Sequence, residues 1–340
     1  MTGGAGFIGS NFVRYVLQQH NDWQVVNLDK LTYAGNLASL ADVEGNPRYT
    51  FIKGDIADRA LVNGVFGEQK PDAVINFAAE SHVDRSMLDA APFVDTNIRG
   101  THVLLEAARE HRIGRFVQIS TDEVYGALGE DGIFTELSPL CPNNPYSASK
   151  ACAELLCRAY HKAYGVPVIV TRSSNNYGPY QFPEKLIPLM IHNALAGKPL
   201  PVYGEGKQVR DWLFVQDNCQ AIDLVLQNGR VGEVYNIGGS CEKPNIEVVE
   251  LIRTILQECP ATRNLHPKIQ FIKDPRGAAH DFRYALDSSK VQRELRWRPS
   301  REFEEGLSET VMWYLRNETW VKNVVTGEYQ EYYRRVYGGG

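Results

Sequence analysis

Short apolar runs rich in β-branched residues alternate with stretches of helix length over the first 174 residues. Nearly continuous apolar runs are typical of parallel strands buried on both faces, with helices covering each side of the sheet. The pattern therefore predicts an α/β fold with a doubly wound parallel sheet. We expect strands at 24–28, 49–52, 72–77, 115–120 and 166–170, and helices at about 8–19, 58–68, 93–112 and 145–164.

After residue 174 the pattern is less regular and richer in proline. We therefore expect two domains, at residues 1–174 and 175–340, the second of them a smaller α/β domain with segments that return to the first sheet. The strands expected in it are 209–215 and 233–237, and the helices lie near 215–227, 245–258 and 302–316.

The two longest expected helices, 93–112 and 145–164, carry more apolar positions than one sheet face needs. Surplus apolar stripes are typical of an interface between two copies of a chain, so a homodimer is expected. Packing within the core of one chain explains the same stripes equally well. The positions are Val103, Leu104, Leu105, Ala107 and Ala108 in the first helix, and Ala151, Leu155, Leu156 and Ala159 in the second.

The composition argues against several classes of protein. A formal net charge of −5 speaks against a general nucleic-acid binder. No apolar run approaches the ~20 residues of a membrane-spanning helix. The six cysteines form no C-x-x-C pair and have no histidine at metal-finger spacing, so neither a metal site nor a disulfide is expected. We therefore expect a cytoplasmic protein without nucleic-acid or membrane partners.

The chain opens with "MTGGAGFIGS", in which Gly3, Gly6 and Gly9 are spaced as in a dinucleotide-binding turn. Such glycines allow a tight turn, close approach of a pyrophosphate and close packing of the next helix. Asp29 ends the following strand, where a carboxylate hydrogen-bonds ribose hydroxyls and repels the extra phosphate of NADP. Lys30 beside it weakens this preference without reversing it. The sequence thus predicts that the first domain is a Rossmann-like NAD-binding domain.

A dinucleotide-binding turn follows the innermost strand of its sheet, yet only Met1 and Thr2 precede the turn. A missing central strand would leave buried amides unpaired, at a cost of about 1 to 3 kcal/mol each. We therefore expect Met1 to stand at the end of a truncated first strand, and the natural chain to begin a few codons earlier. An intact mass of the natively produced protein that matches residues 1–340 would contradict this expectation.

The segment "YSASK" places Tyr146 and Lys150 four residues apart in an expected helix. Residues at this spacing share a helix face about 5 to 6 Å apart, so the ammonium can stabilise a phenolate. This lowers the phenol pKa from about 10 and makes Tyr146 a candidate to take a proton from an alcohol that loses its hydride. The pair also occurs by chance on helix surfaces, but the upstream glycine turn favours the catalytic interpretation.

Together these motifs resemble the extended short-chain dehydrogenase/reductase superfamily. Further segments are similar to its nucleotide-sugar 4,6-dehydratases: "FAAESHVDRS", "ISTDEVYG", "SSNNYGPYQFPEKLIP", "RDWLFVQD" and "YNIGG". The resemblance spans nearly the whole chain. It implies an NAD-dependent lyase that converts dTDP-glucose to its 4-dehydro-6-deoxy product, with residues 175–340 binding the nucleotide sugar.

The resemblance assigns catalytic roles to five residues. Tyr146, assisted by Lys150, takes the proton of the carbon 4 hydroxyl as hydride passes to NAD, and Thr121 hydrogen-bonds the carbon 4 oxygen. Glu123 takes the carbon 5 proton while Asp122 protonates the oxygen leaving carbon 6. Hydride then returns to carbon 6, and Glu123 returns the proton to carbon 5. These roles require a protonated Asp122 and a charged Glu123, which adjacent carboxyls reach only through different environments.

The resemblance also implies binding residues. Lys185 and Arg210 would neutralise the diphosphate, although Arg210 could instead pair with Asp211 at the surface. Asp55 either reaches the adenine ring or is a solvated strand-end residue. The expected cofactor contacts are Gly3, Gly6, Phe7, Ile8, Gly9, Asp29, Lys30, Leu31, Thr32, Asp55, Ile56, Phe77, Ala78, Ala79, Ser81, Thr96, Tyr146, Lys150 and Asn176. The expected substrate contacts are Ser81, Thr121, Asn175, Lys185, Leu186, Pro201, Val202, Tyr203, Arg210, Asn245, Arg276 and His280.

One segment departs from the family pattern. Relatives usually have Asp-Arg-Pro-Gly-His-Asp, whereas residues 274–281 read Asp-Pro-Arg-Gly-Ala-Ala-His-Asp. The change either loosens nucleotide binding through Arg276 and His280 or only reroutes a loop. Two other functions stay open: a 4,6-dehydratase for another nucleotide sugar such as UDP-glucose, and an inactive NAD-binding protein. The joint presence of the five catalytic residues argues against the inactive protein.

Overall fold

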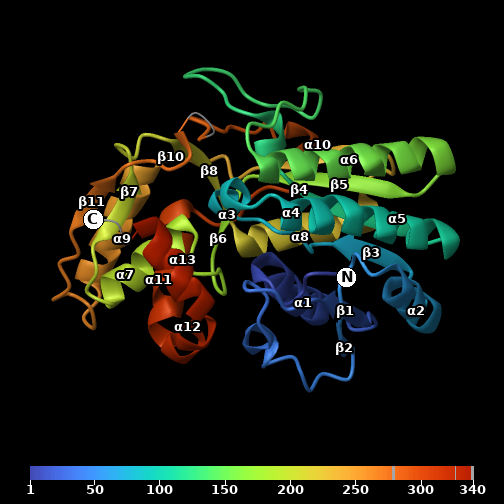
Figure 1. Cartoon of the computed structure of the whole chain (residues 1–340), viewed down its shortest axis with the longest axis horizontal. Coiled ribbons are helices and arrows are strands. Elements are labelled where there is room, and N and C mark those ends of the chain that lie inside the picture. Colours follow the sequence, from blue (N-terminus) through green and yellow to red (C-terminus); the bar gives the residue numbers. More distant parts are fainter. Residues whose placement is uncertain (278–279, 326, 338–340) are drawn as a thin grey trace.

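A computed structural model describes residues 1–277, 280–325 and 327–337. Its larger part is a parallel sheet covered by helices, and short strands and helices form a smaller part at one end (Figure 1). Strands β2 and β1 pair on one side of the sheet centre, and β3, β4, β5 and β9 follow in that order on the other. This confirms the predicted doubly wound α/β fold. The bounds are β1 Val25–Asp29, β2 Tyr49–Lys53, β3 Ala73–Asn76, β4 Arg115–Thr121, β5 Val168–Ser173 and β9 Val234–Ile237.

Met1 and Thr2 lie between β1 and β3, at the centre of the sheet. The N–H of Thr2 donates to the carbonyl of Ile75 at 3.0 Å, and the N–H of Leu28 donates to the carbonyl of Met1 at 3.0 Å. Thr2 forms parallel bridges with both Leu28 and Asn76. The two residues before the glycine turn therefore join the two halves of the sheet, at the place expected for the end of the innermost strand.

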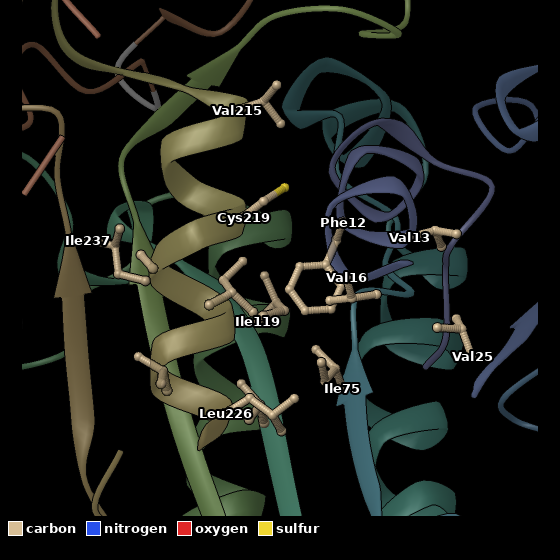
Figure 2. Packing of buried hydrophobic residues seen from close by; sticks show 14 of the residues in the cluster. Phe12, Val13, Val16, Val25, Ile75, Ile119, Val215, Cys219, Leu226 and Ile237 are labelled. Atoms are coloured by element: carbon tan, nitrogen blue, oxygen red, sulfur yellow. The ribbon is translucent and has the colours of Figure 1, made fainter. Parts of the chain in front are cut away.

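Successive strand residues point to opposite faces of the sheet, and helices bury both faces. Val74 and Phe116 pack among residues of α2, α5 and α6. Their neighbours Ile75 and Val117 pack on the other face with α1 and α8, where Phe12 projects toward α8 (Figure 2). Burial of both faces explains the continuous apolar runs in the sequence. The bounds are α1 Phe7–Gln19, α2 Arg59–Gln69, α5 Thr101–Glu110, α6 Pro145–Tyr164 and α8 Val215–Asn228.

Helix α6 has the predicted bounds. The side chain of Asn144 accepts a hydrogen bond from the backbone of the first turn, and Pro145 stands where no N–H partner is needed. Gly165 ends the helix in the left-handed conformation, with φ +70°. These local signals fix the stretch that carries Tyr146 and Lys150.

The helix expected at 93–112 is interrupted: it consists of α4 (Ala91–Phe93), a π-helical turn at 94–100 and α5. The apolar positions expected at a dimer interface in this helix are all buried in the core of the chain itself. Packing within one chain therefore accounts for them. In α6, by contrast, Leu155 is 55% exposed.

The smaller part contains a three-stranded sheet in the order β10–β8–β6 and a β7–β11 pair, with helices around an aromatic core. The expected helices near 215–227, 245–258 and 302–316 are present as α8, α9 and α11. No helix in the described ranges is long and apolar enough to cross a membrane. The remaining bounds are α3 Val83–Leu88, β6 Asn175–Tyr177, α7 Leu186–Leu195, β7 Leu200–Tyr203, β8 Val209–Phe214, β10 Glu242–Pro244, α9 Asn245–Glu258, β11 Ile269–Ile272, α10 Ser289–Leu295, α11 Phe303–Arg316, α12 Glu318–Val324 and α13 Gly327–Tyr337.

Candidate active site

The glycine turn that leads from Thr2 into α1 has no room for a side chain on Gly3, Gly4 or Gly9, and a Cβ on Gly4 would lie 2.4 Å from the side chain of Asn27. A Cβ on Gly9 would lie 2.2 Å from the carbonyl oxygen of Gly3. Gly3 has φ +67°, and a Cβ on it would lie 2.5 Å from the nitrogen of Ala78. A Cβ on Gly6 would meet nothing nearer than 3.4 Å. Gly6 therefore opens into the cavity that begins at this turn, which we call the glycine-turn cavity.

The carboxylate of Asp29 is held at the edge of this cavity by backbone donors. It accepts hydrogen bonds from the N–H of Ala5 at 2.8 Å and the N–H of Leu31 at 2.8 Å. Burial raises the pKa of Asp29, and these two hydrogen bonds act in the opposite direction. The neighbouring ammonium of Lys30 pairs with Asp55 at 2.6 Å. Asp55 thus compensates the positive charge of Lys30. The carboxylate of Asp29 can therefore still repel the extra ribose phosphate of NADP.

The glycine-turn cavity extends from the turn to Tyr146 and Lys150 on α6. All residues expected to contact the dinucleotide line this cavity except Leu31 and Asn176. Asn176 lines a second cavity that adjoins the first, and Leu31 lines neither of the two. Residues that the sequence did not single out also line it, among them Gly35, Glu80, Ile119, Gln181 and Glu184.

The turn that follows β4, Asp122–Tyr125, carries two adjacent carboxyl groups. Asp122 is 1% exposed, and burial followed by the charge of Glu123 raises its pKa well above the ordinary value. This favours the protonated form that an acid requires. Glu123 lines the second cavity and accepts a hydrogen bond from the hydroxyl of Ser147 at 3.2 Å. Thr121 and Asp122 are part of neither cavity lining.

Tyr146 and Lys150 are both buried and both line the glycine-turn cavity. Burial lowers the pKa of Lys150 to about 8, and its ammonium donates to the carbonyl of Ile119 at 2.6 Å. Burial, followed by the charge of Glu123, raises the pKa of Tyr146, and a hydrogen bond with the Thr121 side chain acts in the opposite direction. The lowered phenol pKa predicted from the sequence is therefore wrong, because burial and the charge of Glu123 raise it.

A second cavity adjoins the first, and residues from both halves of the chain line it. We call it the arginine cavity because Arg210 and Arg276 are part of its wall. Most of the expected substrate contacts line this cavity, namely Asn175, Lys185, Leu186, Pro201, Val202, Tyr203, Arg210, Asn245, Arg276 and His280. The two exceptions are Ser81, which lines the glycine-turn cavity, and Thr121, which lines neither cavity.

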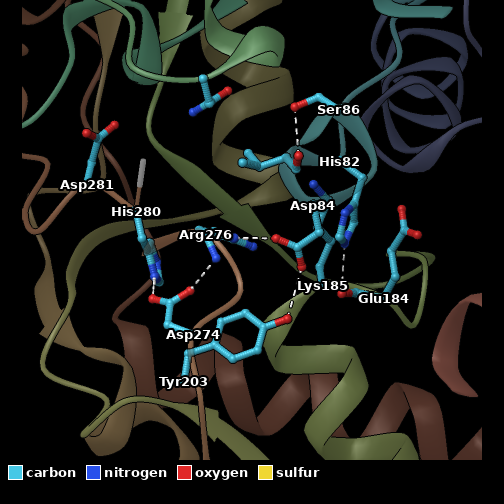
Figure 3. A network of polar contacts seen from close by, with 12 residues as sticks. His82, Asp84, Ser86, Glu184, Lys185, Tyr203, Asp274, Arg276, His280 and Asp281 are labelled. Atoms are coloured by element: carbon cyan, nitrogen blue, oxygen red, sulfur yellow. Dashed lines mark hydrogen bonds and ion pairs between the residues drawn. The ribbon is translucent and has the colours of Figure 1, made fainter. Parts of the chain in front are cut away.

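The altered segment at 274–281 contributes Arg276 and His280 to this wall; residues 278 and 279 between them lie outside the described ranges. The guanidinium of Arg276 bonds the carboxylate of Asp84, which also accepts a hydrogen bond from the phenol of Tyr203 at 3.0 Å (Figure 3). His280 bonds Asp274. Although burial opposes it, the charge of Arg276 holds the pKa of Asp84 well below its usual range. Arg276 and His280, the two predicted side chains of this altered segment, therefore both line the cavity.

Arg210 and Asp211 point to different partners. Arg210 donates to the carbonyls of Val209 at 2.7 Å and Asp281 at 2.9 Å. The carboxylate of Asp211 accepts from the backbone N–H of Cys241 at 2.8 Å. Both residues are buried, so the alternative of a surface ion pair between them is wrong.

Sequence reasoning missed several residues of the two linings. Asp84 lies three residues after Ser81 in the quoted segment "FAAESHVDRS", and Gln181 and Glu184 lie in "SSNNYGPYQFPEKLIP". All three are polar residues inside motifs that had already been singled out. Their burial, at 4 to 7% exposure, is the additional signal, because such burial of polar groups needs specific partners.

Comparisons with known proteins agree with this geometry. The family model described as GDP-mannose 4,6 dehydratase matches residues 1–310. A dTDP-glucose 4,6-dehydratase of Xanthomonas campestris pv. campestris (strain B100) is 55% identical over 97% of this chain and 96% of its own length. Among solved structures, a dTDP-glucose 4,6-dehydratase of Bacillus anthracis in complex with NAD is 52% identical, with a TM-score of 0.86 over 95% of this chain and 98% of that one. Another from Streptomyces venezuelae, with NAD and TYD bound, is 48% identical, with a TM-score of 0.88 over the same shares.

Proposed function

Because this chain belongs to the family of dTDP-glucose 4,6-dehydratases, it removes water from dTDP-glucose with NAD as cofactor, and we propose that the two adjoining cavities carry out this reaction. The observation that supports this assignment is how the reactive groups are divided. Tyr146 and Lys150 line the glycine-turn cavity, and Glu123 lines the arginine cavity. A substrate that lies across the boundary between the two cavities reaches Tyr146, Lys150 and Glu123.

The glycine-turn cavity fits NAD. The glycines of the turn leave space that side chains would otherwise fill, and the N-terminus of α1 faces this cavity. The carboxylate of Asp29 is available to the ribose hydroxyls of the cofactor. We propose that Ser81, Thr96, Asp55 and the other expected lining residues complete the contacts. When bound there, NAD would supply the hydride chemistry of the reaction, which is removal of hydride from carbon 4 and its return to carbon 6.

The residues of the chain supply the proton transfers. Tyr146 takes the proton of the carbon 4 hydroxyl, with Thr121 bonded to its phenol and Lys150 one turn further along α6. Glu123 takes the proton of carbon 5, which the carbon 4 ketone has made acidic, and returns it to carbon 5 when hydride reaches carbon 6. Asp122 lines neither cavity itself but directly precedes Glu123 in the same turn, and we propose that, kept protonated by burial, it gives its proton to the oxygen that leaves carbon 6.

The arginine cavity has the chemistry for a nucleoside diphosphate. Lys185, Arg210 and Arg276 supply positive charge in a largely buried wall, and the ring of Tyr203 supplies a face for a base. We propose that residues 175–340 supply most of the nucleotide-sugar site and residues 1–174 most of the NAD site, with a few residues of each half lining the other cavity.

The direct test is incubation of the purified protein with dTDP-glucose and, separately, UDP-glucose. The expected result is a 4-keto product, detected by its absorbance in alkali, with dTDP-glucose and much less with UDP-glucose. Equal conversion would assign the protein to another or a broader nucleotide-sugar dehydratase activity. No keto product from either would contradict the proposal.

We predict that Arg276→Ala raises the KM for dTDP-glucose by about ten- to a hundredfold with a small change in kcat, since a buried charge-assisted contact contributes about 1.5 to 3 kcal/mol. Steady-state kinetics measure the effect. Arg283→Ala is the control, because Arg283 pairs with Glu242 and lines neither cavity. An unchanged KM in Arg276→Ala would remove Arg276 from the binding site.

We predict different outcomes for two glycines of the turn. Gly9→Ala should destabilise the fold, because its Cβ would lie 2.2 Å from backbone. Gly6→Ala should keep the melting temperature and weaken NAD binding, because its Cβ would project into the cavity. Thermal unfolding and NAD titration separate the two effects. A Gly6→Ala protein that binds NAD as well as the original chain would contradict the placement of NAD.

We also propose a homodimer and a cytoplasmic location. The exposed Leu155 on α6 supports an interface at this helix. The six cysteines are free, which suits a reducing compartment. Analytical ultracentrifugation of the purified chain tests the dimer.

A further inference from the structure

Three residues line both cavities: Gln181, Glu184 and Lys185. The carboxylate of Glu184 pairs with Arg85 at 2.9 Å, and the ammonium of Lys185 donates to the carbonyl of Ser81 at 2.7 Å. Gln181 differs from them because its amide oxygen has no hydrogen-bond partner among the described residues.

The orientation of the Gln181 amide follows from its one hydrogen bond. Its NH2 group donates to the backbone carbonyl of Asn176 at 2.9 Å. A carbonyl can only accept, so the NH2 group must face Asn176 and the oxygen Oε1 must point the other way. Gln181 is 7% exposed, and Oε1 is buried without a hydrogen-bond partner among the described residues. Buried acceptors are nearly always paired, so this one calls for a donor.

The backbone around Gln181 is held firmly. Asn11 on α1 donates to the carbonyl of Pro179 at 2.9 Å, the phenol of Tyr314 on α11 bonds the carbonyl of Gln181, and the phenol of Tyr329 donates to the carbonyl of Pro183 at 3.1 Å. These contacts come from three helices on different parts of the chain. The unpaired oxygen Oε1 of Gln181 is therefore attached to a backbone segment that is fixed by hydrogen bonds.

We propose that Oε1 of Gln181 accepts a hydrogen bond from a ligand where the cofactor and the sugar meet. This inference rests on the proposed function, which brings the reacting ends of both ligands to the common wall. Two donors can reach such a point: the carboxamide NH2 of nicotinamide and a hydroxyl of the glucosyl ring. Gln181 thereby orients one reacting partner relative to the other without taking part in proton transfer.

The variant Gln181→Met removes the acceptor at nearly constant length. We measure its affinity for NAD in nucleotide-free protein by calorimetry. The affinities for dTDP and dTDP-glucose are measured with NAD-loaded protein that also carries Tyr146→Phe, so that dTDP-glucose is not converted, and are compared with those of Tyr146→Phe alone. One neutral hydrogen bond corresponds to an expected loss of about three- to tenfold. A loss confined to NAD identifies the carboxamide as the donor. A loss for dTDP-glucose but not for dTDP, which lacks the sugar, identifies a glucosyl hydroxyl.

The matched control is Asn193→Leu. The amide oxygen of Asn193 on α7 is also buried without a partner in the described ranges, but Asn193 lines neither cavity. Unchanged affinities for all three ligands in Gln181→Met, or equal losses in the control, would overturn the proposal. If Gln181→Met does not fold, Gln181→Ala takes its place. Binding of NAD and dTDP is read without turnover, so failure of this inference is distinguishable from absence of dehydratase activity.

Discussion

Glu123→Gln should let the protein oxidise dTDP-glucose but stop the loss of water. The glutamine cannot take the carbon 5 proton, while Tyr146 and the hydride acceptor remain in place. NADH should therefore accumulate on the protein to one equivalent or less, and formation of the 4-dehydro-6-deoxy product should fall by about 10²- to 10⁴-fold, the usual contribution of a positioned base. Ultraviolet absorbance follows NADH, and mass spectrometry follows the product.

The control for this variant is Glu130→Gln, because Glu130 is exposed and lines neither cavity. It should behave as the original protein does. Full product formation by Glu123→Gln would remove Glu123 from the role of base. Absence of both NADH and product would place the defect before elimination, in binding or oxidation.

Tyr146→Phe should suppress the oxidation itself. It removes the phenol but keeps the ring, which packs edge-on against Phe93 with centroids 6.3 Å apart, so the fold should persist. Without a group to take the carbon 4 hydroxyl proton, both NADH and product should fall by about 10²- to 10⁴-fold. Single-turnover absorbance after mixing with dTDP-glucose measures this.

Tyr160→Phe is the matched control on the same helix. The phenol of Tyr160 donates to Glu106 at 2.7 Å and lines neither cavity, so its loss should leave NADH formation unchanged. If Tyr146→Phe forms NADH at the original rate, another group is the base of the first step.

Local signals predicted the elements that carry the reactive groups. Helix α6 has the expected bounds because Asn144, Pro145 and Gly165 specify its ends without help from distant residues. The strands β3, β4 and β5 were identifiable because burial on both faces makes them largely apolar, whereas the edge strand β2 is partly exposed. The pairing of β7 with β11 was missed, since the two strands lie far apart in sequence and β7 contains Pro201.

The parts of the candidate site that lie in one contiguous motif were predictable from the sequence. The parts that folding brings together from distant segments were predicted only incompletely. Gly3, Gly6 and Gly9 lie in one turn, and the structure places all three at one cavity. The bond between Asp84 and Arg276 joins residues 192 positions apart, so no spacing rule could have found it. The phenol pKa of Tyr146 was misjudged for the same reason, because helix spacing reveals the nearby cation but not the burial that opposes it.

The most direct measurement of the central claim uses dTDP-glucose labelled with deuterium at carbon 4 and no added reductant. If the chain oxidises carbon 4, eliminates water and returns the same hydride, the product should carry the deuterium in its carbon 6 methyl group, as nuclear magnetic resonance would show. A product without deuterium at carbon 6, or recovery of unchanged substrate, would contradict the account.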